Sequence, residues 1–185
     1  MPRIYTRTGD DGTTGLLFGG RVSKADAVPD ALGAIDEVVA ALGLARALAD
    51  PASALSATLL ELQRDLFVVG ADLASNPSER GRLEPGVSRV TDDMVARLES
   101  AIDDLVAAHP LPNAFIVPGA GPASAALDVA RAVARRAERR VVALRGDGTE
   151  VSDAVLRYVN RLSDLLFVLA RIEAGEAEPH SRAGS

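Results

Sequence analysis

Apolar residues recur every three or four positions through most of this chain, which is the spacing that one face of an α-helix produces. The first such run comprises Leu32, Ile35, Val38, Val39, Leu42 and Ala45. Asp50-Pro51 interrupts it, and a second helix is predicted from about Ser53 to Leu73. The apolar positions of this second run are Leu59, Leu62, Leu66, Phe67 and Val69. Both runs predict amphipathic helices that bury one face.

Three further helices are predicted from their start and stop signals. Thr91 is a typical N-cap for a third helix, which ends near His109-Pro110. A connection rich in proline and glycine leads to a fourth helix over residues 123–144. Gly146-Asp147-Gly148 ends that helix, and the fifth runs over residues 152–174.

Five long helices joined by loops, with no alternating apolar pattern to compete with them, predict an all-α five-helix bundle. The loop-like stretch 75–88 and the polar residues 175–185 lie outside these helices. We therefore expect one domain over residues 1–174, followed by a disordered tail. A short edge strand over Pro2–Arg7 stays open as an alternative for the first residues.

Composition narrows the class of protein. Hydrophobic residues make up 48% of the 185 positions but aromatic residues only 3%, so Ala, Leu and Val must fill the core. The formal net charge of −6 argues against a general nucleic-acid binder. Without cysteine the chain has no disulfide framework, and its two histidines leave little room for a zinc centre.

Two further features concern the location of the protein. No run approaches the roughly 20 apolar residues of a membrane span. The first residues, MPRIYTRTGDDG, contain no apolar segment typical of a signal peptide. We therefore expect a cytoplasmic protein that does not act at a membrane.

The segment Tyr5–Gly20, YTRTGDDGTTGLLFGG, is rich in glycine and threonine. Glycines such as Gly9 and Gly15 allow backbone N–H groups to approach an anion, and the threonine hydroxyls add donors. Lys24 follows and supplies a positive charge. The segment lacks the G-x-x-x-x-G-K-[ST] pattern of a Walker A loop. It is either a polyphosphate-binding loop over residues 5–24 or a flexible glycine-rich terminus.

Six arginines and one glutamate lie between Arg131 and Arg145 of the predicted fourth helix. At about 100° per residue, one arc of this helix carries Arg131, Arg135, Glu138 and Arg139. The arc is either a solvated face with local ion pairs or a site for an anion from elsewhere. Three arginines beside one carboxylate favour such an anion, which could be a phosphate chain, an acidic side chain of a partner subunit, or RNA.

The fifth helix pairs an apolar side with a polar side that carries Arg157, Asn160 and Asp164. Asn160 is either a polar group satisfied within the fold or an amide that reads an adenine edge or a ribose hydroxyl. Together, the opening loop and the arginine arc predict a triphosphate site. The loop would supply backbone donors, and the arc would supply the cations that a Walker lysine otherwise provides.

Four segments, in the same order, resemble the PduO-type ATP:cob(I)alamin adenosyltransferases. They are IYTRTGDDGTTGLLFGGRVSK, GAIDEVVAALGLAR, FIVPGAGPASAALDVARAVARRAERR and YVNRLSDLLFVLAR. The resemblance implies a ferritin-like five-helix bundle with an N-terminal ATP-binding loop, assembled as a homotrimer with active sites at the subunit interfaces. It also implies transfer of the 5′-deoxyadenosyl group of ATP to cob(I)alamin, giving adenosylcobalamin and inorganic triphosphate, with Mg2+ accompanying the triphosphate.

The resemblance further implies roles for particular residues. ATP binding would fall on Thr6, Arg7, Thr8, Gly9, Thr14, Gly15, Lys24, Arg135, Arg136, Glu138, Arg139 and Asn160. The residues implied in catalysis are Asp36, Phe115, Arg131 and Arg135. Among these, Asp36 would pair with Arg131 of the partner subunit, and Phe115 would close the lower face of the corrin. The residues that would hold a metal stay unknown.

Three positions differ from the pattern that is common in that family, and all concern the corrinoid side. Val117-Pro118-Gly119-Ala120 stands where the family often has LPGG. Asp128 stands where histidine is common, and no aromatic residue follows Phe167. Contacts to the corrin are therefore expected to differ in this chain.

Partners are also implied by the resemblance. We expect a flavin-dependent reductase that supplies the reduced corrinoid and an adenosylcobalamin-dependent mutase that uses the product, with no role for nucleic acid. Two alternatives keep the same motifs. One is a non-catalytic relative that binds ATP or cobalamin and delivers the cofactor. The other is a helical RNA-binding module that uses the RRAERR face.

Overall fold

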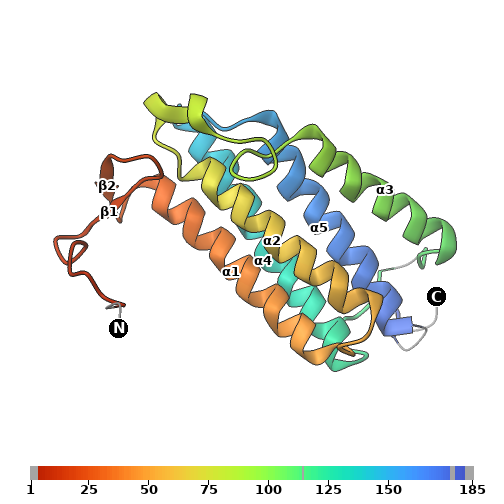
Figure 1. Ribbon diagram of the computed structural model, residues 1–185. Helices are drawn as coiled ribbons and strands as arrows, with labels where there is room; N and C mark the ends of the chain where they lie inside the picture. The colour runs from red at the N-terminus through yellow and green to blue at the C-terminus, as the bar shows by residue number, and fades with distance from the viewer. Residues whose placement is uncertain (1–3, 114, 176–177, 182–185) are drawn as a thin grey trace.

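The computed structural model describes residues 4–113, 115–175 and 178–181. Its long helices are α1 (Ala27–Leu48), α2 (Ala54–Leu73), α3 (Asp92–Ala108), α4 (Pro122–Gly146) and α5 (Asp153–Ala174). They lie alongside one another as a bundle (Figure 1). The predicted all-α bundle is confirmed, and each predicted helix is present.

Local sequence signals explain where these helices begin. The N-cap side chains of α2, α3 and α5 each accept a hydrogen bond from a backbone N–H three residues later, and these caps are Ser53, Thr91 and Ser152. α4 begins at Pro122, where a missing N–H costs no helical hydrogen bond. Among the described residues, none of these helices combines the length and apolar character needed to cross a membrane.

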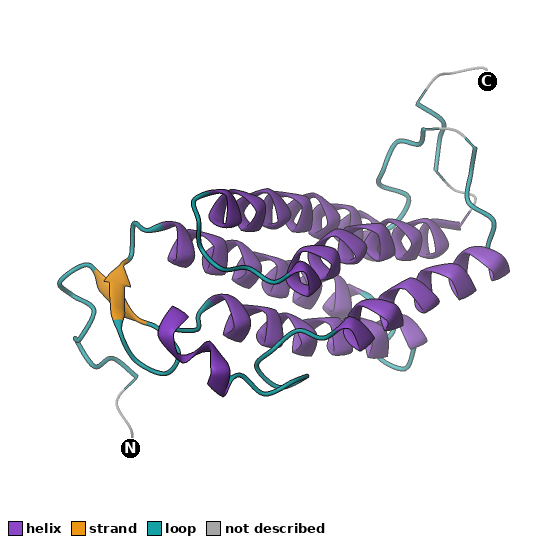
Figure 2. Cartoon of the chain, turned by 90° about the horizontal axis from the view of Figure 1, so that it is seen from above, coloured by secondary structure: helices purple, strands orange, loops and turns teal. Residues whose placement is uncertain are grey.

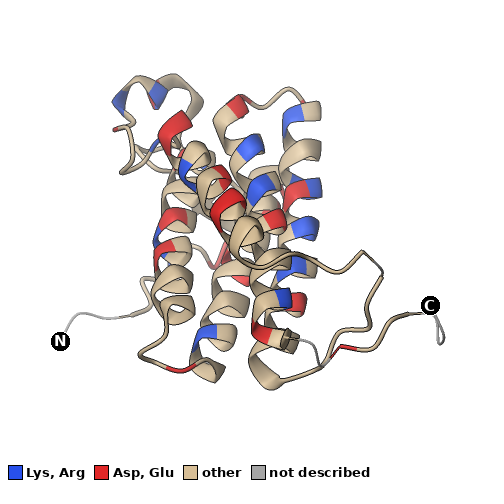
Figure 3. Ribbon diagram, turned by 90° about the vertical axis from the view of Figure 1, so that its right-hand side faces the viewer, with Lys and Arg blue, Asp and Glu red and all other residues tan. Residues whose placement is uncertain are grey.

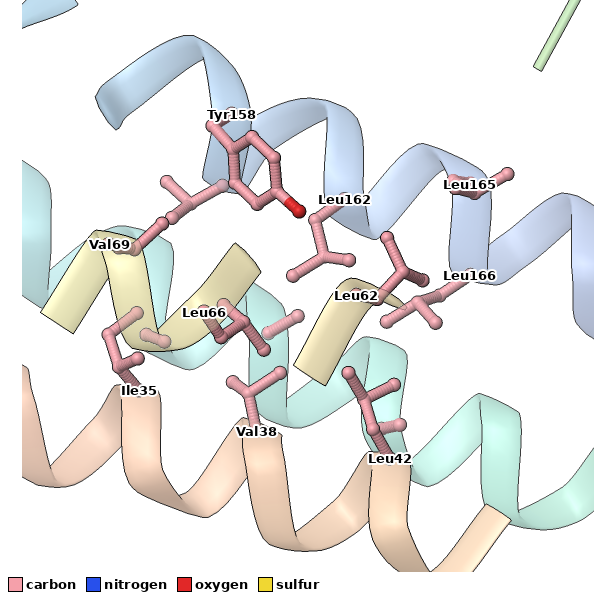
Figure 4. Close-up of a cluster of buried hydrophobic side chains, with 14 of the residues drawn as sticks. Ile35, Val38, Leu42, Leu62, Leu66, Val69, Tyr158, Leu162, Leu165 and Leu166 are labelled. Atoms are coloured by element: carbon pink, nitrogen blue, oxygen red, sulfur yellow. The ribbon is translucent and has the colours of Figure 1, made fainter. Parts of the chain in front are cut away.

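The core lies between α1, α2, α4 and α5, and α3 packs against α5. Figure 4 shows aliphatic side chains of α1, α2 and α5 pointing toward one another, with Tyr158 at one end of the cluster. The buried side of α4 consists largely of alanine, including Ala126, Ala130, Ala134 and Ala137. Because alanine is small, α4 packs into the bundle along this side, and its longer arginines are left toward the surface.

Tyr158 brings a polar contact into the core. Its ring is fully buried, and its hydroxyl donates to Oδ2 of Asp65 on α2 at 2.9 Å. Arg97 of α3 donates to the same oxygen at 2.5 Å. Burial raises the pKa of Tyr158 well above its ordinary value, and the neighbouring Asp65 carboxylate raises this pKa further. The phenol therefore stays protonated and joins α5 to α2, and Asp65 in turn joins α2 to α3 through Arg97.

Two short strands precede the bundle, β1 (Thr13–Gly15) and β2 (Arg21–Ser23), and they pair antiparallel. Between them, Gly19 and Gly20 have φ values of 97° and 83°, a region that favours glycine. The apolar pattern did not predict these strands, because three residues are too few to show an alternation. The alternative strand over Pro2–Arg7 is absent from residues 4–7, and the first residues of that range lie outside the described part.

A 3-10 helix, η1 (Pro77–Arg82), lies within the stretch 75–88 that the sequence predicts as a loop. Asp72, at the end of α2, is buried and accepts a hydrogen bond from Arg80 at 2.7 Å. Its second carboxylate oxygen accepts from the backbone N–H of Val90 at 3.0 Å. This buried carboxylate holds the middle of the stretch, at Arg80, and the residue Val90 just after it against α2.

Residues 178–181, which the polar composition assigned to a disordered tail, lie against the segment Phe115–Val117. The N–H of Val117 donates to the carbonyl of Pro179 at 2.9 Å, and the N–H of Ser181 donates to the carbonyl of Phe115 at 2.7 Å. The contact is made by backbone groups, so the pattern of apolar side chains could not predict it. The other residues beyond Gly175 lie outside the described residues.

Candidate active site

In the opening loop, which spans residues 5–24, the residues before β1 fold back onto the hairpin formed by β1 and β2. Lys24 donates from Nζ to the carbonyl of Gly9 at 2.8 Å, and its backbone N–H donates to the carbonyl of Gly12 at 2.9 Å. Arg21 donates to the carbonyl of Thr8 at 2.5 Å and to Oγ1 of Thr13. Two basic side chains thus hold residues 8–13 in a defined turn. This geometry disfavours the interpretation of a flexible glycine-rich terminus.

Asp11 stabilises the same turn. One of its carboxylate oxygens accepts from the backbone N–H of Thr13 at 2.9 Å and from the hydroxyl of Thr13 at 2.8 Å. These hydrogen bonds lower the pKa of Asp11 below its ordinary value, with a smaller contribution from Arg21. A Cβ at Gly9 would lie 3.2 Å from the backbone carbonyl oxygen of Thr13, which is tighter than an ordinary contact, so glycine suits this position for reasons of space.

The loop is also anchored to the bundle. The N–H of Leu17 donates to the carbonyl of Ala74 at 2.8 Å, and the N–H of Asn76 donates to the carbonyl of Leu17 at 3.0 Å. The guanidinium of Arg82, in η1, lies 4.4 Å from the centre of the Phe18 ring. The sequence did not predict these contacts, because they join segments that are far apart along the chain and come together only in the folded protein.

The arginines of α4 fall into two groups. Arg136 pairs with Glu37, and Arg140 pairs with Asp30 at 3.1 Å, so both are neutralised by α1. Arg135 and Arg139 are exposed and make no hydrogen bond, ion pair or ring contact with the described residues. Figure 3 shows basic and acidic positions spread along the helices. Two guanidinium groups of α4 are therefore available for an anion from outside the chain.

Glu138 is the carboxylate within the arginine arc, and Asn160 holds it. Nδ2 of Asn160 donates to Oε1 of Glu138 at 2.8 Å, and Oδ1 of Asn160 accepts from Arg161 at 2.8 Å. In the single chain Asn160 is a satisfied polar group, the first of its two interpretations. This hydrogen bond joins Asn160 of α5 to Glu138 of α4. Among the described residues, Glu138 forms no ion pair with the arginines of the arc.

Asp36 lies at a surface pocket of about 280 Å³ that is otherwise apolar. The pocket is lined by side chains of α1 and α2, including Phe67, which is 68% exposed although the spacing of apolar residues assigned it to the buried run. Asp36 is itself exposed and has no ion-pair partner in the described part of the chain. An unpaired carboxylate beside an exposed aromatic ring is suited to receive a basic group from another molecule.

Phe115 and Arg131 lie near the other end of the bundle. The start of α4 and the end of α5 lie opposite β1 and β2 (Figures 1 and 2). Phe115 is 88% exposed. Nε of Arg131 lies 3.8 Å from Oδ1 of Asp128, and its guanidinium lies 5.9 Å from the Phe167 ring. The segment that leads into α4, which carries Phe115, and the opening loop therefore lie at opposite ends of the bundle.

The predicted site residues are thus only partly assembled in one chain. Glu138 and Asn160 meet, and Lys24 contacts Gly9, but no hydrogen bond, ion pair or ring contact joins the opening loop to Arg135 or Arg139 within residues 4–113, 115–175 and 178–181. Thr6, Arg7, Thr14 and Gly15 lie in or beside the hairpin. No group of three acidic, histidine or cysteine residues among the described positions could hold a metal ion.

Known proteins share this architecture. The family model described as cobalamin adenosyltransferase matches residues 4–173. The corrinoid adenosyltransferase of Mycobacterium tuberculosis (strain H37Rv) is 43% identical over 185 residues, covering 100% of this chain and 95% of that protein. The corrinoid adenosyltransferase of Bacillus subtilis (strain 168) is 40% identical over 173 residues, covering 92% and 86% respectively.

A solved structure agrees with this likeness. A variant of the PduO-type ATP:corrinoid adenosyltransferase from Lactobacillus reuteri, complexed with cobalamin and ATP, has a TM-score of 0.84 and 33% sequence identity. The match covers 96% of this chain and 95% of that chain. Fold and site together define a helical bundle that presents unpaired arginines to an anion. The chain belongs to the cobalamin adenosyltransferase family.

Proposed function

We propose that this protein is an ATP:corrinoid adenosyltransferase, which transfers the 5′-deoxyadenosyl group of ATP to cob(I)alamin and releases inorganic triphosphate. The observation that carries the proposal is 43% identity to a corrinoid adenosyltransferase over the whole length of this chain. The unpaired Arg135 and Arg139 agree with a polyanionic substrate. The opening loop over residues 5–24, which contains the hairpin, also agrees with a polyanionic substrate, since the loop presents backbone N–H groups and hydroxyls at the surface.

The protein's contribution to the reaction is orientation and electrostatic stabilisation. Reduced corrinoid is itself the nucleophile, so no side chain has to act as a general base. Arg135, Arg139 and Lys24 would stabilise the negative charge that gathers on the leaving triphosphate, with Thr6, Thr8, Thr14 and the loop amides as further donors. Asn160 and Glu138 would hold the adenosine end of ATP. Arg7, Gly9 and Gly15 complete the proposed ATP site, and Arg136 would join it only by exchanging its ion pair with Glu37 for the ligand.

The site is completed by a second subunit in this proposal, within a homotrimer. Asp36 would pair with Arg131 of the partner subunit, which explains an exposed carboxylate at an apolar pocket with no partner in the single chain. The opening loop of one subunit would then meet the arginine arc of the next. This assembly would also bring together the opening loop and the start of α4, which lie toward opposite ends of the bundle in one chain (Figure 1).

Phe115 has a separate proposed role at the corrinoid. Reduction to Co(I) is easier after the lower axial ligand has left the cobalt. An apolar ring below the corrin would exclude water and the nucleotide tail from that position. The 88% exposure of Phe115 supports this role, because a ring of this size gains most from being covered by a ligand.

Magnesium, partners and location belong to the same proposal. Mg2+ usually keeps substrate phosphates among its ligands, so it would bind with the triphosphate of ATP. A flavin-dependent reductase would supply the reduced corrinoid, and an adenosylcobalamin-dependent mutase would receive the product. We place this reaction in the cytoplasm.

A spectroscopic assay tests the reaction directly. Purified protein is mixed with ATP, Mg2+ and chemically reduced cob(I)alamin, and the conversion to adenosylcobalamin is followed together with the release of triphosphate. One triphosphate per adenosylcobalamin is the expected result. Tight ATP binding without product would instead favour a carrier that delivers the cofactor, and the absence of both binding and product would overturn the proposal.

A further inference from the structure

Arg171, in the last turns of α5, joins two acidic residues from different parts of the chain. Its side chain is only 4% exposed. It pairs with Asp128 near the start of α4, and its Nε lies 2.9 Å from Oε2 of Glu178 in the C-terminal segment. The Phe167 ring lies 5.2 Å from its guanidinium. We refer to Arg171, Asp128 and Glu178 as the Arg171 cluster.

This cluster is not the arrangement that stability alone would favour. Burying one guanidinium and two carboxylates carries a desolvation cost that ion pairing offsets only when the remaining polar atoms are also bonded. Oδ1 of Asp128 and Oε1 of Glu178 are buried and accept no hydrogen bond from the described residues, and Nε of Arg171 meets Glu178 as an ion pair without the geometry of a hydrogen bond. Burial raises the pKa of Glu178 above its ordinary value, although Arg171 opposes the shift. The cluster therefore calls for a role other than stabilising the core.

The cluster acts on the segment that carries Phe115. Glu178 directly precedes Pro179, whose carbonyl accepts the N–H of Val117 at 2.9 Å. Two residues further on, Ser181 donates to the carbonyl of Phe115 itself at 2.7 Å. Arg171 thus holds one end of a short backbone pairing whose other side is Phe115–Val117.

The pairing of residues 115–117 with residues 178–181 lies beside a hollow. A pocket of about 480 Å³ lies beside it, between the end of α3, the end of α5 and the C-terminal segment. Ile116, Arg171 and Glu178 are among the residues that line this pocket. Because the segment borders a hollow, the ion pair of Glu178 and the two backbone hydrogen bonds are contacts that can hold it in place.

We propose that Arg171 is a positioning residue, which docks residues 178–181 against Phe115–Val117 through Glu178 and thereby orients Phe115 for the corrinoid. The inference rests on the proposed role of Phe115 and adds to it the group that holds this residue in place. Asp128 also lies 3.8 Å from Arg131, so the cluster joins the Phe115 segment to the arginine that is proposed to cross the subunit interface.

Hydrogen exchange tests the docking without any substrate. In Arg171→Met we expect the amides of Val117 and Ser181 to exchange about tenfold faster or more, because the segment opens locally while the core stays folded. The amide of Leu166, in the core of α5, should keep its exchange rate. Arg145→Met is the matched control, since it removes an exposed ion pair with Asp153 that also joins α4 to α5.

A milder variant covers the case in which Arg171→Met does not fold. Glu178→Ala leaves Arg171 paired with Asp128 and removes only the link to the C-terminal segment. It should raise the exchange rates of Val117 and Ser181 in the same way. Unchanged exchange of both amides in a folded variant would overturn the docking, whatever the activity of the protein.

Activity then tests the consequence for Phe115. Starting from Co(II) with a reductant, Arg171→Met should lose about tenfold in turnover, while turnover from chemically reduced Co(I) and the KM for ATP stay within about twofold. Phe115→Ala should show the same selective loss, and the double variant should be no worse than Phe115→Ala. Equal losses in both assays would show a merely structural role. If the unaltered protein forms no product, the proposed function fails, whereas the exchange result still decides the docking.

Discussion

Neighbouring arginines on α4 have opposite surroundings. Arg136 and Arg140 face α1 and pair with Glu37 and Asp30. Arg135 and Arg139 each lie one position earlier, about 100° around the helix, and have no partner in the described part of the chain. The fold therefore supplies carboxylates for one pair of arginines and leaves the other pair for a ligand.

The presence or absence of an internal ion pair separates arginines that the fold neutralises from arginines that can bind a ligand. An exposed ion pair contributes at most about 1 kcal/mol to folding, so neither group of arginines is required for the bundle to form. What separates the groups is whether the chain itself neutralises them. An arginine without a carboxylate can bind phosphate without first breaking an internal ion pair, and this favours Arg135 and Arg139 as triphosphate ligands.

The largest effect is expected from removing one unpaired arginine. Arg135→Ala should lower turnover from cob(I)alamin by about 10² or more, because a charged donor to the leaving triphosphate is worth a few kcal/mol in the transition state. Arg140→Ala should change turnover by less than about twofold, because Arg140 already pairs with Asp30. Both values come from the spectroscopic assay at saturating ATP. Equal losses in the two variants would remove the distinction between paired and unpaired arginines.

An intermediate effect is expected from Asn160. This amide engages Glu138, so Asn160→Ala frees the carboxylate to pair with Arg135, three residues earlier on the same helix. We expect the KM for ATP to rise about tenfold for two reasons. Glu138 then neutralises an arginine that would otherwise bind ATP, and ATP also loses its polar contact with Asn160. The double variant Asn160→Ala/Glu138→Gln separates the two causes, since it removes the competing charge. No recovery of the KM in the double variant would mean that ATP binding depends on the contacts that Asn160 and Glu138 make with ATP, and not on competition between Glu138 and ATP for Arg135.

The helices and their order could be predicted from the sequence because the information is local. Apolar spacing, N-cap residues such as Thr91 and the Gly146-Asp147-Gly148 break all lie within the segments that they define. The hairpin was missed because its strands have three residues each. The η1 helix was missed because a stretch rich in Pro and Gly is typical of a loop as well.

The candidate site could be predicted only as a set of residue types and a family resemblance. Glu37 and Arg136 are separated by 99 positions, and no local pattern shows that α1 neutralises this arginine and not Arg135. The same limit applies to the C-terminal segment, whose polar composition predicted disorder for Glu178 although Arg171 pairs with it. Contacts between distant segments follow from packing, which spacing along one helix does not encode.

The smallest effect concerns the stability of the paired group. Arg140→Ala should lower the free energy of unfolding by no more than about 1 kcal/mol, because both partners of its ion pair with Asp30 are at the surface and water screens them. Leu42→Ala, in the core between α1 and its neighbours, should cost about 2–5 kcal/mol and serves as the reference. Denaturant unfolding of the three proteins measures both values. If Arg140→Ala approached the cost of the core variant, the ion pairs with α1 would be structural supports of the bundle, and the division of α4 would reflect stability as well as ligand binding.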